Sequence, residues 1–173
     1  MKSEKMGFKK TSETIAISFN VVETAPSVFT QDEIALQLDI LNNEVFVVLA
    51  VDLNLSPPEA IAATDTSVLA SITSTASLAM QGLDNSNTLA VARDDIRAAG
   101  FVDGGVGFSR GATETYTGDV DYIGIIATNN FFIGLQGNGN LGVSALNGRV
   151  WGYRAKADSS TYAALVQSEV LSA

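Results

Sequence analysis

Two aspartates provide the first residues in this chain whose type and spacing could do chemistry. Asp119 and Asp121 lie two positions apart, so in a β-strand both side chains would point to the same face. Such a pair could bind calcium with help from carbonyl oxygens or another subunit. It could also be the acid and base of a hydrolase, but no basic or aromatic cluster surrounds it in sequence. A solvated strand start is the simplest interpretation, and structural calcium is the alternative.

The residue inventory excludes several kinds of site. The chain has no Cys and no His, which rules out disulfides, thiolate nucleophiles, Ser-His triads and the common zinc sites. The glycines of GLQGNGNLG do not lie between a strand and a helix of a βαβ unit, as a dinucleotide site requires. That stretch instead favours a hairpin turn. We therefore expect neither an enzyme nor a cofactor, calcium apart.

Two aromatic residues alternate along the stretch RVWGYRAK near the C-terminus. Trp151 and Tyr153 would share one face of a strand, and Arg149 and Arg154 cannot both share that face with Trp151. Paired aromatics could form a sugar-stacking platform, but they more often belong to a core or an interface. We interpret Arg149, Trp151, Tyr153 and Arg154 as a subunit contact, with a plain sheet face as the alternative.

Positive charge is concentrated at the N-terminus. Four of the ten basic residues lie in the first ten positions, although the whole chain has a formal net charge of −9. These residues are Lys2, Lys5, Lys9 and Lys10. A basic arm on an acidic body could contact nucleic acid or an acidic patch on another copy of the chain. Many such arms on one assembly would act together through avidity.

The elements that would position these residues are mostly strands. Alternating or continuous apolar patterns predict strands at 14–22, 33–40, 44–55, 66–78, 119–128, 130–137 and 147–157. Two of these segments, 119–128 and 130–137, look like neighbouring strands of one sheet joined through Asn129. Residues 89–100 fit a strand running into a helical turn, or a short helix. Asn, Gly and Pro turns separate the segments.

The chain ends differently, in an expected amphipathic helix. Asp158 or Ser159 would cap it, and Tyr162, Leu165 and Val166 fall on one side. We divide the chain into a basic arm at 1–12, a β-sandwich domain at 13–157, and a helix at 158–173 packed on the domain or a neighbour. The predicted fold class is all-β: an antiparallel sandwich of jelly-roll type with a short C-terminal helix.

The order of elements, a basic arm MKSEKMGFKK followed by about eight strands, resembles viral coat proteins of the single jelly-roll type. The resemblance implies a self-assembling capsid subunit that forms a closed shell, located in the virion and made in the host cytoplasm. Its partners would be further copies of itself, and nucleic acid through the arm. The apolar run from Val45 to Val51 is too short for a transmembrane segment, and no export signal is expected.

Two other classes of function fit the same features. A carbohydrate-binding module or adhesin would share the sandwich fold and the exposed aromatic residues. A filament or surface-layer subunit would assemble into open fibres or sheets. The state of assembly separates these alternatives from a closed shell.

Overall fold

Two antiparallel sheets form the protein in a computed structural model that describes residues 7–98, 100, 105–111, 114–116 and 121–173. Sheet A contains β1 (Phe8–Lys10), β2 (Ile15–Val22), β4 (Glu44–Leu55), β8 (Glu114–Tyr116), β9 (Gly124–Ile126) and β11 (Ala145–Ala157). Sheet B contains β3 (Thr30–Ala35), β5 (Thr66–Thr73), β6 (Thr88–Arg97), β7 (Val106–Gly111) and β10 (Asn130–Asn138). A single-turn helix, η1 (Ile40–Asn42), precedes β4, and α1 (Ser159–Leu171) follows β11.

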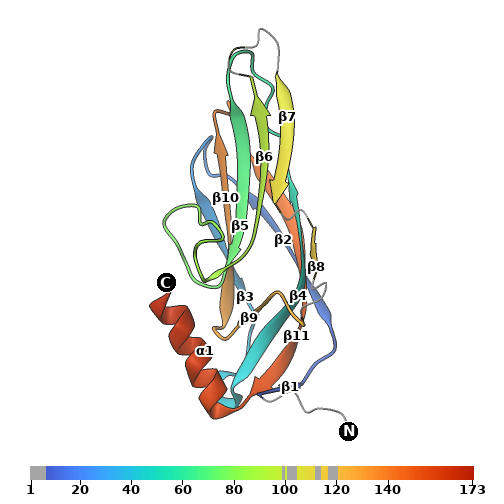
Figure 1. Ribbon diagram of the computed structural model, residues 1–173, viewed down its shortest axis with the longest axis vertical. Helices are drawn as coiled ribbons and strands as arrows, with labels where there is room; N and C mark the ends of the chain where they lie inside the picture. Colours follow the sequence, from blue (N-terminus) through green and yellow to red (C-terminus); the bar gives the residue numbers. More distant parts are fainter. Residues whose placement is uncertain (1–6, 99, 101–104, 112–113, 117–120) are drawn as a thin grey trace.

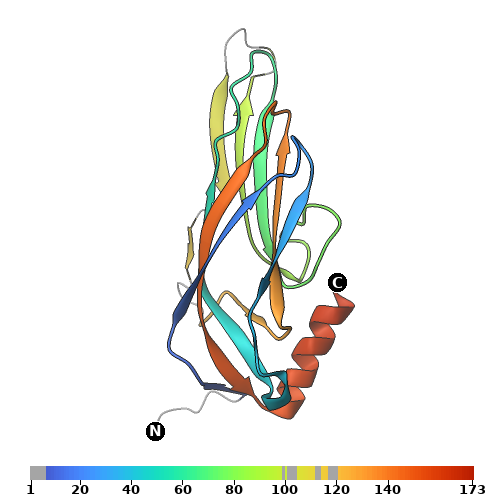
Figure 2. The same cartoon turned by 180° about the vertical axis from the view of Figure 1, so that it is seen from behind.

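The strand pairs are nested along the chain. β2 pairs with β11, β3 with β10, β4 with β9, and β5 with β6, all antiparallel. Successive pairs alternate between sheet A and sheet B, so the chain forms one long ribbon rolled into a sandwich (Figures 1 and 2). This is the jelly-roll order, with two sheets built from Greek keys. The predicted antiparallel β-sandwich is therefore confirmed.

The main core lies between the two sheets. Its largest fully buried side chains include Phe46 on β4, Phe131 on β10 and Ile72 on β5. β4 changes which side faces this core, because its register against β11 shifts between Trp151 and Gly152. A β-bulge of this kind adds one residue to the strand, so the alternation of its side chains between the two faces is reversed beyond that point. The strand is buried on both faces at its start, as its continuous apolar sequence predicts.

One predicted pair of neighbouring strands is wrong. The described part of the predicted strand, 121–128, contains only the short strand β9, which pairs with β4 in sheet A, whereas β10 belongs to sheet B. The chain crosses between the sheets at Asn129. The Asn129 backbone oxygen accepts from Leu36 N at 2.8 Å, and its side-chain oxygen accepts from Leu38 N at 2.6 Å. These bonds fix the crossing where an unbroken hairpin was expected.

The strand predicted at 33–40 also ends early. β3 stops at Ala35, and Gln37 has a positive φ of 54° that breaks the extended backbone. Leu36 and Leu38 are nevertheless buried in the core, whereas Ile40 is exposed in η1. The ambiguous segment 89–100, in contrast, contains the strand β6, as one of the two interpretations predicts.

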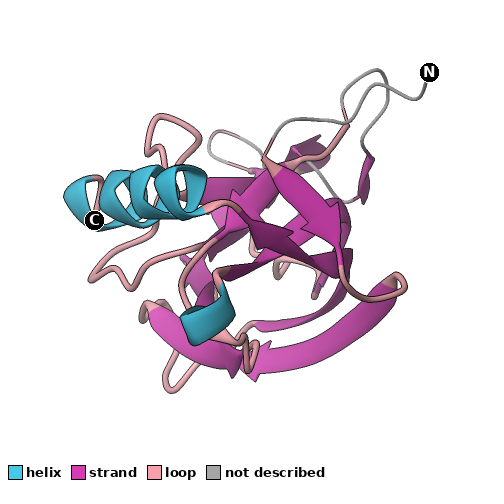
Figure 3. Cartoon of the chain, turned by 90° about the horizontal axis from the view of Figure 1, so that it is seen from below, coloured by secondary structure: helices cyan, strands magenta, loops and turns pink. Residues whose placement is uncertain are grey.

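The C-terminal helix lies along the outside of the sandwich (Figure 3). Asp158 caps it by accepting a hydrogen bond from Thr161 N at 2.8 Å. Tyr162, Leu165 and Val166 pack on a second apolar cluster that includes Val45 and Val47 of β4. No helix in the described ranges has the length and apolar character needed to cross a bilayer.

The buried carboxyl of Glu169 on α1 is expected to make the stability of the protein depend on pH. The Glu169 side chain is buried, its Oε1 accepts from Ala127 N at 2.7 Å, and burial raises the pKa of its carboxyl above the usual 4.5. As the pH rises above 4.5, the unfolded chain loses this proton before the folded chain does, so the free energy of unfolding falls. Glu169→Gln should match the wild type at low pH and exceed its stability near neutral pH, because the amide cannot ionise.

Urea unfolding at a series of pH values measures this difference. Subtracting the Glu169→Gln curve from the wild-type curve removes contributions from other groups, including Asp158, whose pKa is lowered by its bond from the Thr161 backbone N–H. Glu13→Gln is the matched control, because the Glu13 side chain is 99% exposed and has no burial cost to relieve. Parallel pH curves for Glu169→Gln and wild type would contradict the assignment.

Candidate functional site

Three connecting loops gather at one end of the sandwich, the upper end in Figures 1 and 2. They are the β2–β3 loop (23–29), the β4–β5 loop (56–65) and the β10–β11 loop (139–144). We call this region the loop end. Loops usually carry the variable and functional surface of a rigid scaffold. The loop end is held together by three carboxylates, each of which accepts backbone N–H groups from a neighbouring loop or strand.

Glu23 forms the most buried of these contacts. Its side chain is only 4% exposed, and its two oxygens accept from Gly137 N and Ser144 N, both at 2.6 Å. The Glu23 backbone N–H also donates to Ser144 O at 3.0 Å. The β10–β11 loop is therefore anchored at both of its ends by one residue of the β2–β3 loop. Carboxylate-to-amide bonds of this kind are stronger than neutral hydrogen bonds.

Glu59 holds the middle of the same β10–β11 loop. Its oxygens accept from Leu141 N at 2.7 Å and from Gly142 N at 2.9 Å. The Glu59 backbone N–H in turn donates to the side-chain oxygen of Asn140 at 2.9 Å. The Asn140 amide nitrogen donates to Ser67 O at 2.9 Å. The hairpin turn predicted from the Gly and Asn residues is wrong, because β10 belongs to sheet B and β11 to sheet A, and this loop crosses between the two sheets.

Asp65 makes the same kind of carboxylate-to-backbone contact at the end of β6. One of its oxygens accepts from Ala98 N at 2.8 Å, and the other pairs with Arg97 at 3.5 Å. Gly139, with a φ of +74°, allows the β10–β11 loop to pass close to Asp65, because a Cβ there would lie 2.6 Å from the Asp65 carbonyl oxygen. Asp65 thus ties the β4–β5 loop to the end of β6.

The loop end exposes apolar side chains although its backbone is fixed. Leu141 is 80% exposed, and Val143, Val22 and Val28 are between 43% and 51% exposed. Leu141 and Val143 belong to the loop that Glu23 and Glu59 hold. Exposed apolar groups on a rigid backbone can be buried by a partner without the entropy cost of ordering a loop. The arrangement therefore suits a contact surface.

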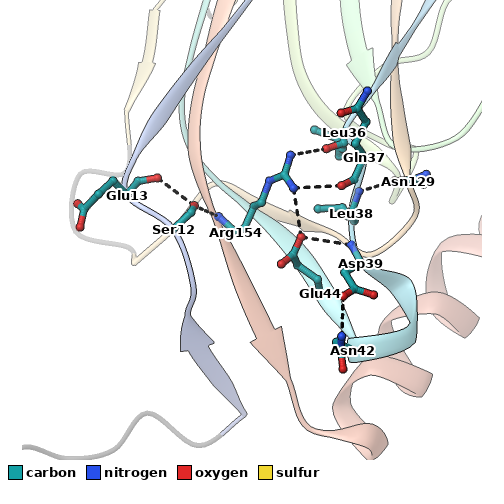
Figure 4. A network of polar contacts seen from close by, with 10 residues as sticks. All are labelled: Ser12, Glu13, Leu36, Gln37, Leu38, Asp39, Asn42, Glu44, Asn129 and Arg154. Carbon is teal, nitrogen blue, oxygen red and sulfur yellow. Dashed lines mark hydrogen bonds and ion pairs between the residues drawn. The ribbon is translucent and has the colours of Figure 1, made fainter.

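Arg154 ties the opposite end of the sandwich (Figure 4). Its guanidinium donates to Leu36 O at 2.8 Å and Gln37 O at 3.0 Å, and it pairs with Glu44 at 3.4 Å. The Arg154 backbone N–H donates to the hydroxyl of Ser12 at 2.9 Å. The predicted subunit contact at Arg154 thus falls on a side chain engaged within its own chain.

The remaining predicted contact residues lie together on the outer face of sheet A. The Arg149 guanidinium lies over the Trp151 ring at 5.8 Å, and the Lys10 amine lies over the Tyr153 ring at 5.0 Å. Arg149, Trp151 and Tyr153 alternate with residues that face inward, as their spacing predicts. Arg149 and Arg154 do lie on opposite sides of the strand, because Arg154 is four positions from the inward-facing Val150 and shares its side, whereas Arg149 directly precedes Val150 and faces outward.

Two of the four N-terminal lysines, Lys9 and Lys10, lie within the described residues. Lys2 and Lys5 lie outside the described residues. Lys9 and Lys10 are exposed on β1, where they pair in register with Lys156 and Ala155 of β11. The predicted arm at 1–12 therefore includes a short strand of sheet A, and Phe8 of that strand packs on the α1 cluster.

Only one member of the predicted calcium pair lies within the described residues, so the pairing of Asp119 with Asp121 stays a prediction. Asp119 lies outside the described residues, and Asp121 is exposed in a bend before β9. Asp121 shares a small hollow of about 150 Å³ with Lys10 and Tyr153, so a cation there would meet a positive charge. Across the described ranges, no group of three or more acidic residues could hold a metal ion.

Comparison with known proteins adds little to this picture. No family model matches the chain, and no curated protein matches it significantly. Among solved structures, a chain of Desmodium yellow mottle tymovirus is similar, with 12% identity and a TM-score of 0.33 over 84% of this chain and 88% of that one. Similarity at this level does not distinguish between functions that share a fold. The function must be argued from the residues themselves.

Proposed function

We propose that the protein is a structural subunit that assembles with copies of itself, and that it is a viral coat protein forming a closed shell. The observation that supports this most is the loop end, where Leu141 and Val143 are exposed on a loop held rigid by Glu23 and Glu59. Contacts between such surfaces can each be weak, because closed symmetry multiplies them. Jelly-roll domains occur in viral coats and also in lectins, so the fold alone is an analogy.

The remaining parts of the proposal concern location and charge. The subunit would be made in the host cytoplasm and located in the virion. Its basic N-terminal residues, with Lys9 and Lys10 exposed on β1, would contact nucleic acid or an acidic face of a neighbour. Arg149, Trp151 and Tyr153 would provide a second, lateral contact. Because the chain carries a net charge of −9, subunits repel one another, and assembly should increase with ionic strength or with calcium.

Replacing Leu141 by aspartate tests the loop-end contact. We expect the wild-type protein to form particles in light scattering and negative-stain microscopy as salt or calcium is raised. Leu141→Asp should reduce the assembled fraction at least tenfold, because a desolvated carboxylate would enter the contact. Its unfolding midpoint should stay close to that of the wild type, because the side chain is 80% exposed.

Leu41→Asp is the matched control at the opposite end of the molecule. Leu41 is 91% exposed in η1, so the variant adds the same charge without touching the loop end. Equal losses of assembly in both variants would contradict the role of the loop end. Wild-type protein that remains monomeric under every salt and calcium condition would overturn self-assembly itself. Open fibres or sheets in the microscope would identify a filament or surface-layer subunit instead.

A further inference from the structure

A polar hollow of about 380 Å³ lies on the outer face of sheet A, apart from the loop end and from α1. Its lining comes from three adjacent strands, β2, β11 and β4. The lining residues are Ser18, Phe19, Asp52, Asn54, Asn147, Gly148, Arg149 and Trp151. Strands of a sheet are rigid supports, so these side chains hold their relative positions better than loop residues would. The polar groups of the hollow therefore hold fixed relative positions before any ligand binds.

The strand register brings the polar groups of the hollow together. Arg149 on β11 lies directly opposite Ser18 on β2 and Asp52 on β4, and Asn147 lies opposite Asn54. Residues directly opposite one another share a face, with their Cβ atoms about 5 Å apart. One carboxylate, one guanidinium, two amides and a hydroxyl therefore project from a patch two residue rows deep. Next along the same face is Trp151, whose partners on both neighbouring strands are alanines.

The hydrogen-bonding capacity of these groups is only partly used. Arg149 Nε donates to Ser18 Oγ at 3.1 Å while its guanidinium stacks on Trp151. No ion pair within the described residues joins Arg149 to Asp52, although the two are cross-strand partners. The Asp52 carboxylate accepts no hydrogen bond from the described part of the chain. Acceptor oxygens and guanidinium N–H groups are therefore both available to a ligand.

The side-chain amides of Asn54 and Asn147 also have hydrogen-bonding groups that are not used by the described residues. Asn54 donates to Asn147 Oδ1 at 3.1 Å, which uses one donor and one acceptor of the pair. Each amide group has two donors and an acceptor, so the pair can still both donate and accept. Amide, carboxylate and guanidinium groups side by side match a ligand whose own groups both donate and accept. Hydroxyl groups do this.

We propose that this hollow binds a neutral saccharide. A purely anionic ligand would face Asp52, and a purely cationic ligand would face Arg149, whereas a neutral polyhydroxylated ring pairs with both. Its hydroxyls would donate to Asp52 and accept from Arg149 and the amides, while its C–H face would lie on the apolar wall that Trp151 provides. None of these residues belongs to the loop end, but Arg149 and Trp151 also belong to the proposed lateral contact, so binding is measured at low ionic strength, where the acidic subunits repel one another.

The single tryptophan of the chain makes the hollow directly observable. Trp151 is the only Trp, so intrinsic tryptophan fluorescence of the full-length protein reports on this place alone. The probes are free neutral saccharides: glucose, galactose, mannose, xylose, N-acetylglucosamine, N-acetylgalactosamine and their short oligomers. At least one should change the emission in a saturable way. Asp52→Ala should weaken that binding at least tenfold, because two or more hydroxyl contacts lose their acceptor.

Asp32→Ala is the matched control. Asp32 lies on β3 in sheet B, so the variant removes one strand carboxylate elsewhere and should leave binding unchanged. Each variant is checked for an unchanged unfolding midpoint, which separates a lost ligand contact from a lost fold. Saturable binding that Asp52→Ala does not alter would overturn the proposal. Sialylated and sulfated sugars are titrated alongside this panel. Absence of a response to every neutral saccharide, with or without a response to the charged sugars, or binding that a chelator abolishes would overturn the proposal too.

Discussion

Glu23→Gln is expected to destabilise the fold almost as severely as Glu23→Ala, by about 2–4 against about 3–5 kcal/mol of unfolding free energy. Both Glu23 oxygens accept backbone N–H groups, from Gly137 and Ser144, inside a site that is 4% exposed. Glutamine offers one acceptor and one NH2 group. In either orientation its NH2 faces a second donor, so one buried N–H loses its partner and meets a repulsive neighbour.

Glu59→Ala provides a graded comparison for this prediction. Glu59 makes the same kind of two-oxygen contact to the same loop, but its bond to Leu141 N is exposed to water. Water can replace the lost acceptor there, so we expect a loss of only about 1 kcal/mol. Urea unfolding followed by circular dichroism measures all three variants. A Glu23→Gln midpoint equal to that of the wild type would contradict the two-acceptor arrangement.

The same variants connect stability to the proposed assembly. Under conditions in which Glu23→Gln remains folded, its β10–β11 loop should lose its fixed position and therefore its advantage as a contact surface. The assembled fraction should then fall together with the loop, although Leu141 and Val143 are unchanged. Full assembly by a folded Glu23→Gln variant would show that rigidity of the loop is not required.

Gly152→Ala is expected to cost about 3 kcal/mol or more, because the methyl group has no space. Gly152 lies on β11 at the register shift against β4. A Cβ at this position would overlap the Val47 carbonyl oxygen and approach two Phe46 ring atoms at 2.7 Å. Val47 is held in the ladder and the Phe46 side chain is fully buried, so neither can move without breaking other contacts.

Gly107→Ala is the control for the loss of a strand glycine as such. Gly107 lies on β7, and the nearest atom to an added Cβ is the Asp95 carbonyl oxygen at an ordinary 3.9 Å. Alanine there should be neutral or stabilising by up to about 1 kcal/mol, because it reduces the freedom of the unfolded chain. Thermal unfolding of both variants measures the difference in stability. Similar melting temperatures for Gly152→Ala and Gly107→Ala would refute the steric argument.

The pattern of apolar residues predicted much of the fold. Alternation along 14–22 and 147–157 corresponds to β2 and β11, and the continuous apolar run of 44–55 corresponds to the doubly covered strand β4. These predictions succeed because a period of two is a local property of the chain. The cap at Asp158 is local as well, since it needs only the backbone three residues later.

Partners across the sandwich could not be predicted in this way. Residues 119–128 and 130–137 look like a hairpin in sequence, yet Asn129 bonds to Leu36 and Leu38 and sends the two segments into different sheets. Those bonds join residues about ninety positions apart. No local pattern encodes such a pairing, because it depends on how the whole ribbon rolls up.

The sequence by itself determined an all-β chain with a capped C-terminal helix, a Gly- and Asn-rich loop, and no thiol or imidazole chemistry. Only the tertiary structure decided that Glu23 closes that loop from 114 positions away, or that Asp52 and Arg149 face one another across β4 and β11. In sequence Glu23, Asp52 and Arg149 look like ordinary surface charges. Their roles arise because folding brings Glu23 to unpaired N–H groups and places Asp52 opposite Arg149. Local spacing along the chain does not specify these contacts.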